Sequence, residues 1–247
     1  MGPDPIPGEG EPARLVQDSS GTRLSGVKTF CSGATGLDRA LVLVRGASPG
    51  PLLLAYVDLS EGAQVDTTWF KGAGMRASES HRVVFDGTPV LAVLGEPGEL
   101  VKEPYFSRDA IRTAVTWAGI SDTALDAALD VLAAKAGDRA PDDVVSLAAG
   151  RMLTARGTID RWLAYAAGRA DADPSSLPGI STQLREAVAL SCRGIIDEAA
   201  RAVGSHPFAV SGPLDRARRD LELFLLQHRL EPALVRHGRQ AILGRQQ

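Results

Sequence analysis

Long apolar runs, closely spaced cysteines and a clear excess of one charge are all missing from this sequence of 247 residues. The longest apolar run, Pro51 to Val57, is far too short to span a membrane. The first twelve residues carry neither the basic nor the apolar region of a secretion signal. We therefore expect no membrane insertion and no export, and so a cytoplasmic protein. The formal charge is −3, which predicts no polyanion-binding surface and no nucleic-acid partner.

The two cysteines, Cys31 and Cys192, lie far apart and in no spacing typical of a zinc site or of a disulfide framework. We expect both to be reduced thiols and expect no metal. The short motifs of phosphate-binding loops, dinucleotide-binding folds, zinc proteases and serine hydrolases are absent as well. No function can therefore be assigned from one of these motifs alone, and the remaining sequence signals are weaker and local.

Residues 1–103 have the pattern of short strands separated by turns, with no helical segment between them. The expected strands cover residues 13–17, 22–31, 40–44, 52–59, 64–70 and 81–85, and Asp86-Gly87 is expected to form a tight turn. This pattern predicts an antiparallel β-barrel or sandwich. The first twelve residues are rich in glycine and proline, and their composition predicts a flexible tail.

Residues 104–247 change to alanine- and leucine-rich stretches with helical periodicity. The expected helices are Ser107–Lys135, Asp142–Ala170, Ser181–Val203 and about Leu214–Leu230, and prolines lie in the gaps between the first three and interrupt the chain after the fourth. Four long helices with short connections form a bundle. The predicted fold class is therefore α+β, with a β-domain at 1–103 followed by a four-helix bundle at 104–247.

Three segments carry local signatures. Phe30, Cys31 and Ser32 end a strand with an aromatic ring and a hydroxyl, which suits a flat heterocycle, although an ordinary strand running into a turn has the same pattern. A polar loop over residues 74–87 could hold an anion or cap a neighbouring element. Gly204 and Ser205 follow the third helix, where a glycine C-cap could approach a diphosphate but needs no ligand to explain it.

In this order, the three segments resemble the acyl-CoA dehydrogenase family of FAD-dependent flavoproteins, over residues 4 to 240. The resemblance implies that Phe30, Cys31 and Ser32 line the flavin and that Gly204 and Ser205 approach the FAD diphosphate. It implies an oxidoreductase that removes a proton and a hydride from an acyl-CoA or another acyl thioester. It also implies a homodimer or homotetramer assembled through the helical bundle.

Some family features are missing. Arg201 stands where the family has a glutamine, and the Arg-x-x-Phe-Gly segment is not recognisable around residues 133–143. The family also has an N-terminal helical domain, and at about 100 residues such a domain has an ordinary size. This sequence does not contain it, so we expect either a partner chain that supplies it or a chain that is a fragment.

The resemblance also indicates a catalytic residue. Family members use a glutamate as the base, sixteen positions into the segment that begins at the proline corresponding to Pro213, and that position here is His228. Histidine, with an ordinary pKa near 6.5, can accept a proton at neutral pH. Three alternatives remain open: a flavin monooxygenase on the same fold, a structural histidine at a helix end, and a flavin-free subunit that serves as a scaffold.

Overall fold

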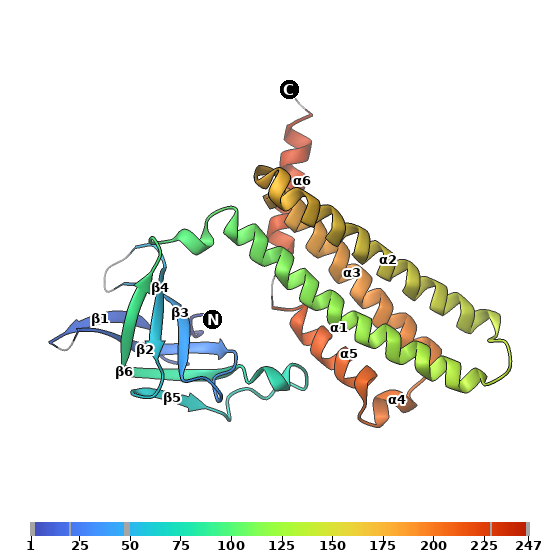
Figure 1. Ribbon diagram of the computed structural model, residues 1–247, viewed down its shortest axis with the longest axis horizontal. Coiled ribbons are helices and arrows are strands. Elements are labelled where there is room, and N and C mark those ends of the chain that lie inside the picture. Colours follow the sequence, from blue (N-terminus) through green and yellow to red (C-terminus); the bar gives the residue numbers. More distant parts are fainter. Residues whose placement is uncertain (1–2, 20, 47–49, 228, 246–247) are drawn as a thin grey trace. The chain divides into compact units, whose positions relative to one another are not determined.

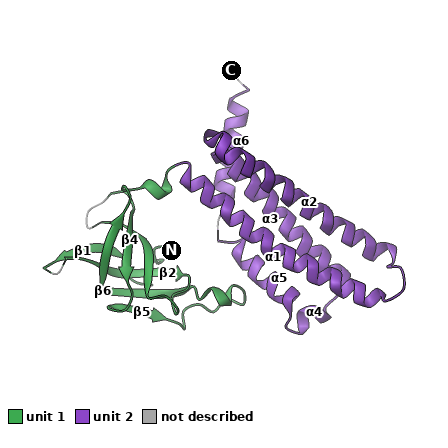
Figure 2. Ribbon diagram, in the orientation of Figure 1, with its two compact units in different colours: residues 1–102 green, residues 103–247 purple. Residues whose placement is uncertain are grey.

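The computed structural model describes residues 3–19, 21–46, 50–227 and 229–245. The chain divides into two compact units, Met1–Lys102 and Glu103–Gln247, which we call the strand unit and the helix unit (Figure 2). Each unit has its own cluster of buried hydrophobic side chains. The predicted α+β fold class is therefore confirmed.

The strand unit contains six strands within the described residues: β1 Arg14–Asp18, β2 Gly21–Cys31, β3 Arg39–Val44, β4 Leu53–Asp58, β5 Ala63–Asp66 and β6 His81–Leu94 (Figure 1). All their pairings are antiparallel. The order is β1-β2-β6-β4-β3, and β5 also pairs with β6. Alternate side chains of these strands face inward, and Leu24, Val42 and Val57 are fully buried there. Such alternation is typical of strands that bury one face.

The tight turn expected at Asp86-Gly87 is wrong, because both residues lie inside β6. β6 pairs with β5 as far as Phe85 and with β2 as far as Pro89, and then with β4 from Val90 to Leu94, so that it belongs to both parts of the sheet. The Asp86 N–H donates to the carbonyl of Gly62. Long-range partners thus satisfy backbone groups that a local turn would otherwise have paired within itself.

The flexible tail expected at the N-terminus is also wrong for the part that the structure describes. The carbonyls of Pro3 and Glu11 accept hydrogen bonds from backbone N–H groups of β2. Lys28 of β2 is only 3% exposed, and its ammonium donates to the Asp4 carboxylate at 2.8 Å. A buried ammonium needs a charged partner, and this requirement orders the N-terminal segment along β2.

The helix unit contains α1 Tyr105–Ala136, α2 Asp143–Ala172, α3 Leu177–Val203, α4 His206–Ala209, α5 Pro213–Phe224 and α6 Glu231–Leu243 (Figure 1). The fourth expected helix is too long, because α5 ends at Phe224 rather than at Leu230. Pro232 stands in the first turn of α6. Proline lacks an N–H and is tolerated only at the beginning of a helix, so the chain must leave one helix before it starts the next.

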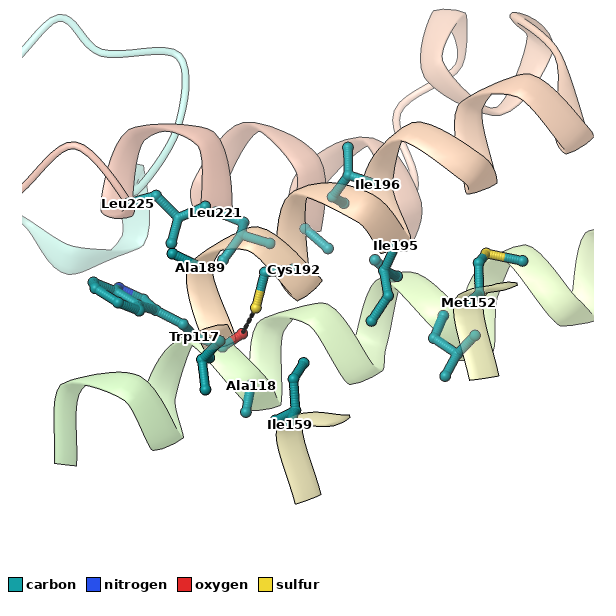
Figure 3. Close-up of a cluster of buried hydrophobic side chains, with 14 of the residues drawn as sticks. Trp117, Ala118, Met152, Ile159, Ala189, Cys192, Ile195, Ile196, Leu221 and Leu225 are labelled. Atoms are coloured by element: carbon teal, nitrogen blue, oxygen red, sulfur yellow. Dashed lines mark hydrogen bonds between the residues drawn. The ribbon is translucent and has the colours of Figure 1, made fainter. Parts of the chain in front are cut away.

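The core of the helix unit lies between α1, α2, α3 and α5 (Figure 3). The predicted stripe on α3 is buried throughout; its members are Leu184, Val188, Ile195, Ala199 and Val203. Cys192 lies beside this stripe, and its thiol contacts the carbonyl of Trp117 at 3.7 Å. Burial raises the pKa of the Cys192 thiol to about 11. None of the described helices is long and apolar enough to cross a bilayer.

Gly26 provides a test of how closely the N-terminal segment packs on β2. A Cβ at Gly26, whose φ is +116°, would lie 2.7 Å from both Ala13 Cα and the Pro12 carbonyl oxygen. We expect Gly26→Ala to lower the free energy of unfolding by about 1–3 kcal/mol more than Gly21→Ala. Gly21 is a matched control, because its φ is +124° and its Cβ would meet nothing within 4 Å. Equal losses in urea unfolding would contradict this packing.

Candidate functional site

Phe30 lies near the end of β2 and presents an exposed ring. The register between β2 and β6 shifts between Lys28 and Cys31, so Phe30 falls in a β-bulge, a feature that re-aims side chains near functional sites. Its φ is +51°, a left-handed conformation that costs a non-glycine residue about 1–2 kcal/mol. The residue is 49% exposed. Strained residues of this kind gather at functional sites, which marks Phe30 as a candidate.

Two further aromatic rings, those of Trp69 and Phe70, pack edge-on against Phe30. Their centroids lie 4.8 Å and 6.4 Å from the centroid of Phe30. The Trp69 indole N–H donates to the Glu9 carboxylate at 3.0 Å. Phe30 is therefore part of a cluster of three rings, which we call the aromatic cluster.

Sequence reasoning missed Trp69 and Phe70, because it placed both in a strand over residues 64–70. β5 ends at Asp66 instead. The Asp66 carboxylate accepts hydrogen bonds from the N–H and the hydroxyl of Thr68, at 3.0 and 2.8 Å, and these bonds form a local turn that ends the strand. The Asp-Thr-Thr sequence before two adjacent aromatic residues is the signal that could have located the turn.

Ser32 begins a chain of serine hydroxyls. Its oxygen lies 3.0 Å from the Ser80 hydroxyl, which lies 2.7 Å from the Ser78 hydroxyl. The Ser78 hydroxyl donates to the carbonyl of Met75 at 2.6 Å. The structure thus brings the segment that contains Ser32 together with the polar loop over residues 74–87. Ser80 is a member that sequence reasoning did not single out.

The direction of this chain follows from proton counting. Each serine hydroxyl has one proton to donate, and a carbonyl can only accept. Because Ser78 donates to Met75, Ser80 must donate to Ser78, and Ser32 must donate to Ser80. Ser32 is exposed. Its oxygen therefore keeps a lone pair that no described residue uses, and it can accept a hydrogen bond from an N–H of a ligand.

Backbone hydrogen bonds hold the two segments in place. The Gly33 N–H donates to the Ser78 carbonyl at 2.8 Å, and the Ala34 N–H donates to the Glu79 carbonyl at 3.2 Å. Met75 and Glu79 have φ values of +56° and +47°. With Phe30, they are the non-glycine residues of positive φ in the described part of the chain. All three belong to this region, so the strain is concentrated at the candidate site.

The Glu79 side chain closes the loop by a second set of contacts. Its carboxylate oxygen accepts a hydrogen bond from the Thr35 hydroxyl at 3.0 Å and lies 3.0 Å from His81 Nε2. The hydrogen bond from His81, followed by that from Thr35, lowers the pKa of Glu79. The Glu79 side chain therefore stays ionised and anchors the loop at neutral pH.

Cys31 does not share the exposure of Phe30 and Ser32. It is 5% exposed, and it faces the interior of the strand unit, where it lines a cavity of about 80 Å³ together with Val83 and Phe85. Successive side chains of a strand point to opposite faces. Ser32 lines the same cavity, so the structure separates the Cys31 side chain from the exposed Phe30 ring but not from Ser32.

Gly204 and Ser205 belong to the helix unit. Gly204 is the C-cap of α3, with a φ of +74°, and its N–H donates to the carbonyl of Ala200. A Cβ at Gly204 would meet nothing within 4 Å, so the backbone is open on that side. Ser205 is exposed and precedes α4. The C-cap role expected for Gly204 is thus observed.

His228 lies outside the described residues, between the end of α5 at Phe224 and the start of α6 at Glu231. Its role therefore stays a prediction. In the described part of the chain, no three His, Cys, Asp or Glu side chains are grouped so that they could hold a metal ion.

Comparison with solved structures identifies the fold. The sequence matches no protein-family model and no curated protein. The structure is similar to dibenzothiophene monooxygenase (TdsC) from Paenibacillus sp. A11-2, with a TM-score of 0.75 and 22% identity over 92% of this chain and 66% of that chain. The chain has the fold of these enzymes.

Two other solved structures are similar to this chain in fold. A probable acyl-CoA dehydrogenase from Mycobacterium abscessus has a TM-score of 0.74 and 18% identity, over 86% of this chain and 58% of that chain. A nitrososynthase from Micromonospora carbonacea var. africana has a TM-score of 0.73 and 24% identity, over 93% of this chain and 63% of that chain. The resemblance to acyl-CoA dehydrogenases is thereby confirmed for the fold. The chain spans less than two thirds of the length of TdsC.

The strained backbone of Phe30 gives a test of the site. We expect Phe30→Gly to be about 1 kcal/mol more stable than Phe30→Ala, because glycine adopts positive φ without strain. At Leu41, an exposed position of β3, we expect the usual order, in which alanine is the more stable replacement. Urea unfolding of the four variants measures both differences. An alanine variant at residue 30 as stable as the glycine variant would contradict the strain.

Proposed function

We propose that this chain binds a flavin and is an oxidoreductase. The observation that carries the proposal is the exposed Ser32, whose hydroxyl has a lone pair left to accept, two residues after the strained and exposed Phe30. The shared fold supports it, since one solved structure of TdsC contains FMN and indole, and one of KijD3 contains FMN and a nucleotide sugar. Both proteins are similar to this chain in fold at 22% identity.

The residues of the site fit such a group. A flavin has a flat ring system with one N–H donor on its edge, between two carbonyl oxygens. The aromatic cluster offers ring surface of which Phe30 is the most exposed member described, and aromatic rings favour stacked or edge-on contacts with flat ligands. Ser32 offers an acceptor whose direction is set by its bond to Ser80. Phe30 would position the flavin ring system, and Ser32 would hold its edge by a hydrogen bond.

The resemblance to acyl-CoA dehydrogenases supports one form of the flavin. FAD has a diphosphate and FMN has none. The open backbone at Gly204 and Ser205 would approach that diphosphate, so a role for these two residues belongs to FAD. We propose FAD as the cofactor and FMN as the alternative. Cys31, which faces the interior, would support the ring only through the backbone of β2.

The proposed reaction is the removal of a proton and a hydride from an acyl thioester such as an acyl-CoA. When bound, the flavin supplies two-electron chemistry and takes up the hydride. His228 would take the proton from the carbon next to the thioester carbonyl, as a neutral imidazole can at pH 7. The alternative is a flavin-dependent monooxygenase, which the similarity to TdsC favours.

The partners follow from the same resemblance. We propose a homodimer or homotetramer assembled through the helix unit, and a helical partner chain that completes the acyl pocket. A flavin-free subunit that acts as a scaffold is the remaining alternative, and it is the outcome that absence of flavin binding would support.

Titration with FAD and with FMN tests the proposal. We expect visible absorbance of bound flavin after removal of free ligand, and a Kd for Ser32→Ala about 3–10-fold higher than for the wild type, as expected for one lost hydrogen bond. Thr22→Val is the matched control. It removes a hydroxyl from the other end of β2, and we expect it to leave the Kd unchanged. No bound flavin, or equal losses in both variants, would contradict the site.

A second measurement separates the two reactions. With the flavin bound, anaerobic addition of an acyl-CoA should bleach the flavin band if the chain is a dehydrogenase. If the band stays unchanged, and the pre-reduced protein consumes oxygen with oxygenation of an aromatic substrate, the monooxygenase alternative is correct.

A further inference from the structure

The helix unit contains a partly buried arginine, two of whose guanidinium nitrogens are buried and lack an acceptor among the described residues. Arg185 of α3 buries its Nε and Nη2 atoms, and neither atom has a hydrogen-bond partner among the described residues. These two atoms form one edge of the guanidinium. That edge is the fork that pairs side-on with both oxygens of a carboxylate or a phosphate.

Trp117 of α1 holds this guanidinium in place. Arg185 Cζ lies 5.6 Å from the centroid of the Trp117 ring, a cation–π distance. Phe224 of α5 contacts Trp117 edge-on, with centroids 6.2 Å apart. Trp117 is fully buried, and its indole N–H also lacks an acceptor. Two adjoining side chains thus contain three buried donor atoms that nothing described accepts.

No acid among the described residues forms an ion pair with Arg185. Burial lowers its pKa, but a guanidinium stays protonated at any ordinary pH. Asp109 is the acid whose charge acts on Arg185, and its exposed carboxylate already binds Arg112 at 2.7 Å. A buried charge and buried donors without partners are both unfavourable. An incoming anion would satisfy both.

We propose that Arg185 and Trp117 form an oxyanion subsite in the helix unit, which binds a carboxylate or a phosphate group of a ligand. The guanidinium fork of Arg185 takes two oxygens of that group, and the ring of Trp117 fixes the plane of the fork. This inference does not depend on flavin binding. The group can come from the substrate or from the phosphate of a cofactor, and the experiment separates these two sources.

The test measures the Tm of the full chain in chloride buffer, and then with sodium acetate or sodium phosphate at matched ionic strength. We expect either oxyanion to raise the Tm of the wild type by about 2–4 °C more than chloride, at several times its Kd. Arg185→Met should lose this rise. Arg193→Met is the matched control, because it removes an exposed arginine from the same helix, and it should keep the rise.

Arg185→Lys covers the case in which the methionine variant fails to fold. Lysine keeps the charge but loses the two-donor fork, so the rise should be smaller than in the wild type. The proposal is overturned if the Tm of the wild type responds equally to chloride and to both oxyanions. It is also overturned if the rise in Tm survives in Arg185→Met. Where Arg185→Met does not fold, a rise that survives in full in Arg185→Lys overturns it.

Comparison of FMN with riboflavin identifies the source of the oxyanion. If FMN stabilises the wild type more than riboflavin does, and Arg185→Met abolishes that difference, the subsite takes the phosphate of a cofactor. If FMN and riboflavin act alike while acetate and phosphate still depend on Arg185, the subsite takes an anionic group of the substrate.

Discussion

Two backbone hydrogen bonds determine the candidate site, those from the Gly33 and Ala34 N–H groups to the carbonyls of Ser78 and Glu79. They join the end of β2 to the loop that precedes β6, two segments more than forty positions apart in the sequence. Because Ser32 is next to one end of this connection, its hydroxyl meets that of Ser80. Because the Ser78 hydroxyl donates to the Met75 carbonyl, Ser80 donates to Ser78 and Ser32 donates to Ser80. The Ser32 oxygen is therefore left to accept a hydrogen bond from a ligand.

The two units offer different chemistry to a ligand. The strand unit presents ring surface and a hydrogen-bond acceptor at Phe30 and Ser32, whereas the helix unit contains unpaired donors at Arg185 and Trp117. Each feature is unfavourable for stability taken alone. Phe30 has a strained backbone, and Arg185 buries a charge without an acceptor. Such features persist where the surrounding structure holds them in place, and they are typical of binding sites.

Sequence periodicity predicted what depends on burial. The stripe on α3 was recovered because that helix buries one face, and burial repeats with the period of the helix. Contacts between segments that lie far apart in the sequence leave no such periodic signal. Asp86-Gly87 has the composition of a turn but lies inside β6, because β2 pairs with β6 on both sides of it, at Phe85 and at Thr88. The N-terminal residues look flexible, but Asp4 is held by the buried ammonium of Lys28.

Only part of the candidate site was singled out from the sequence. The resemblance singled out Phe30 and Ser32, whereas the Trp69 ring and the unpaired fork of Arg185 arise only from three-dimensional contacts.

The most direct test of the central claim is amide NMR of the chain during titration with a flavin. Shifts concentrated at residues 29–35, 69–70 and 75–82 are the expected result. Shifts confined to other residues, or their absence, would contradict a flavin site at the end of β2.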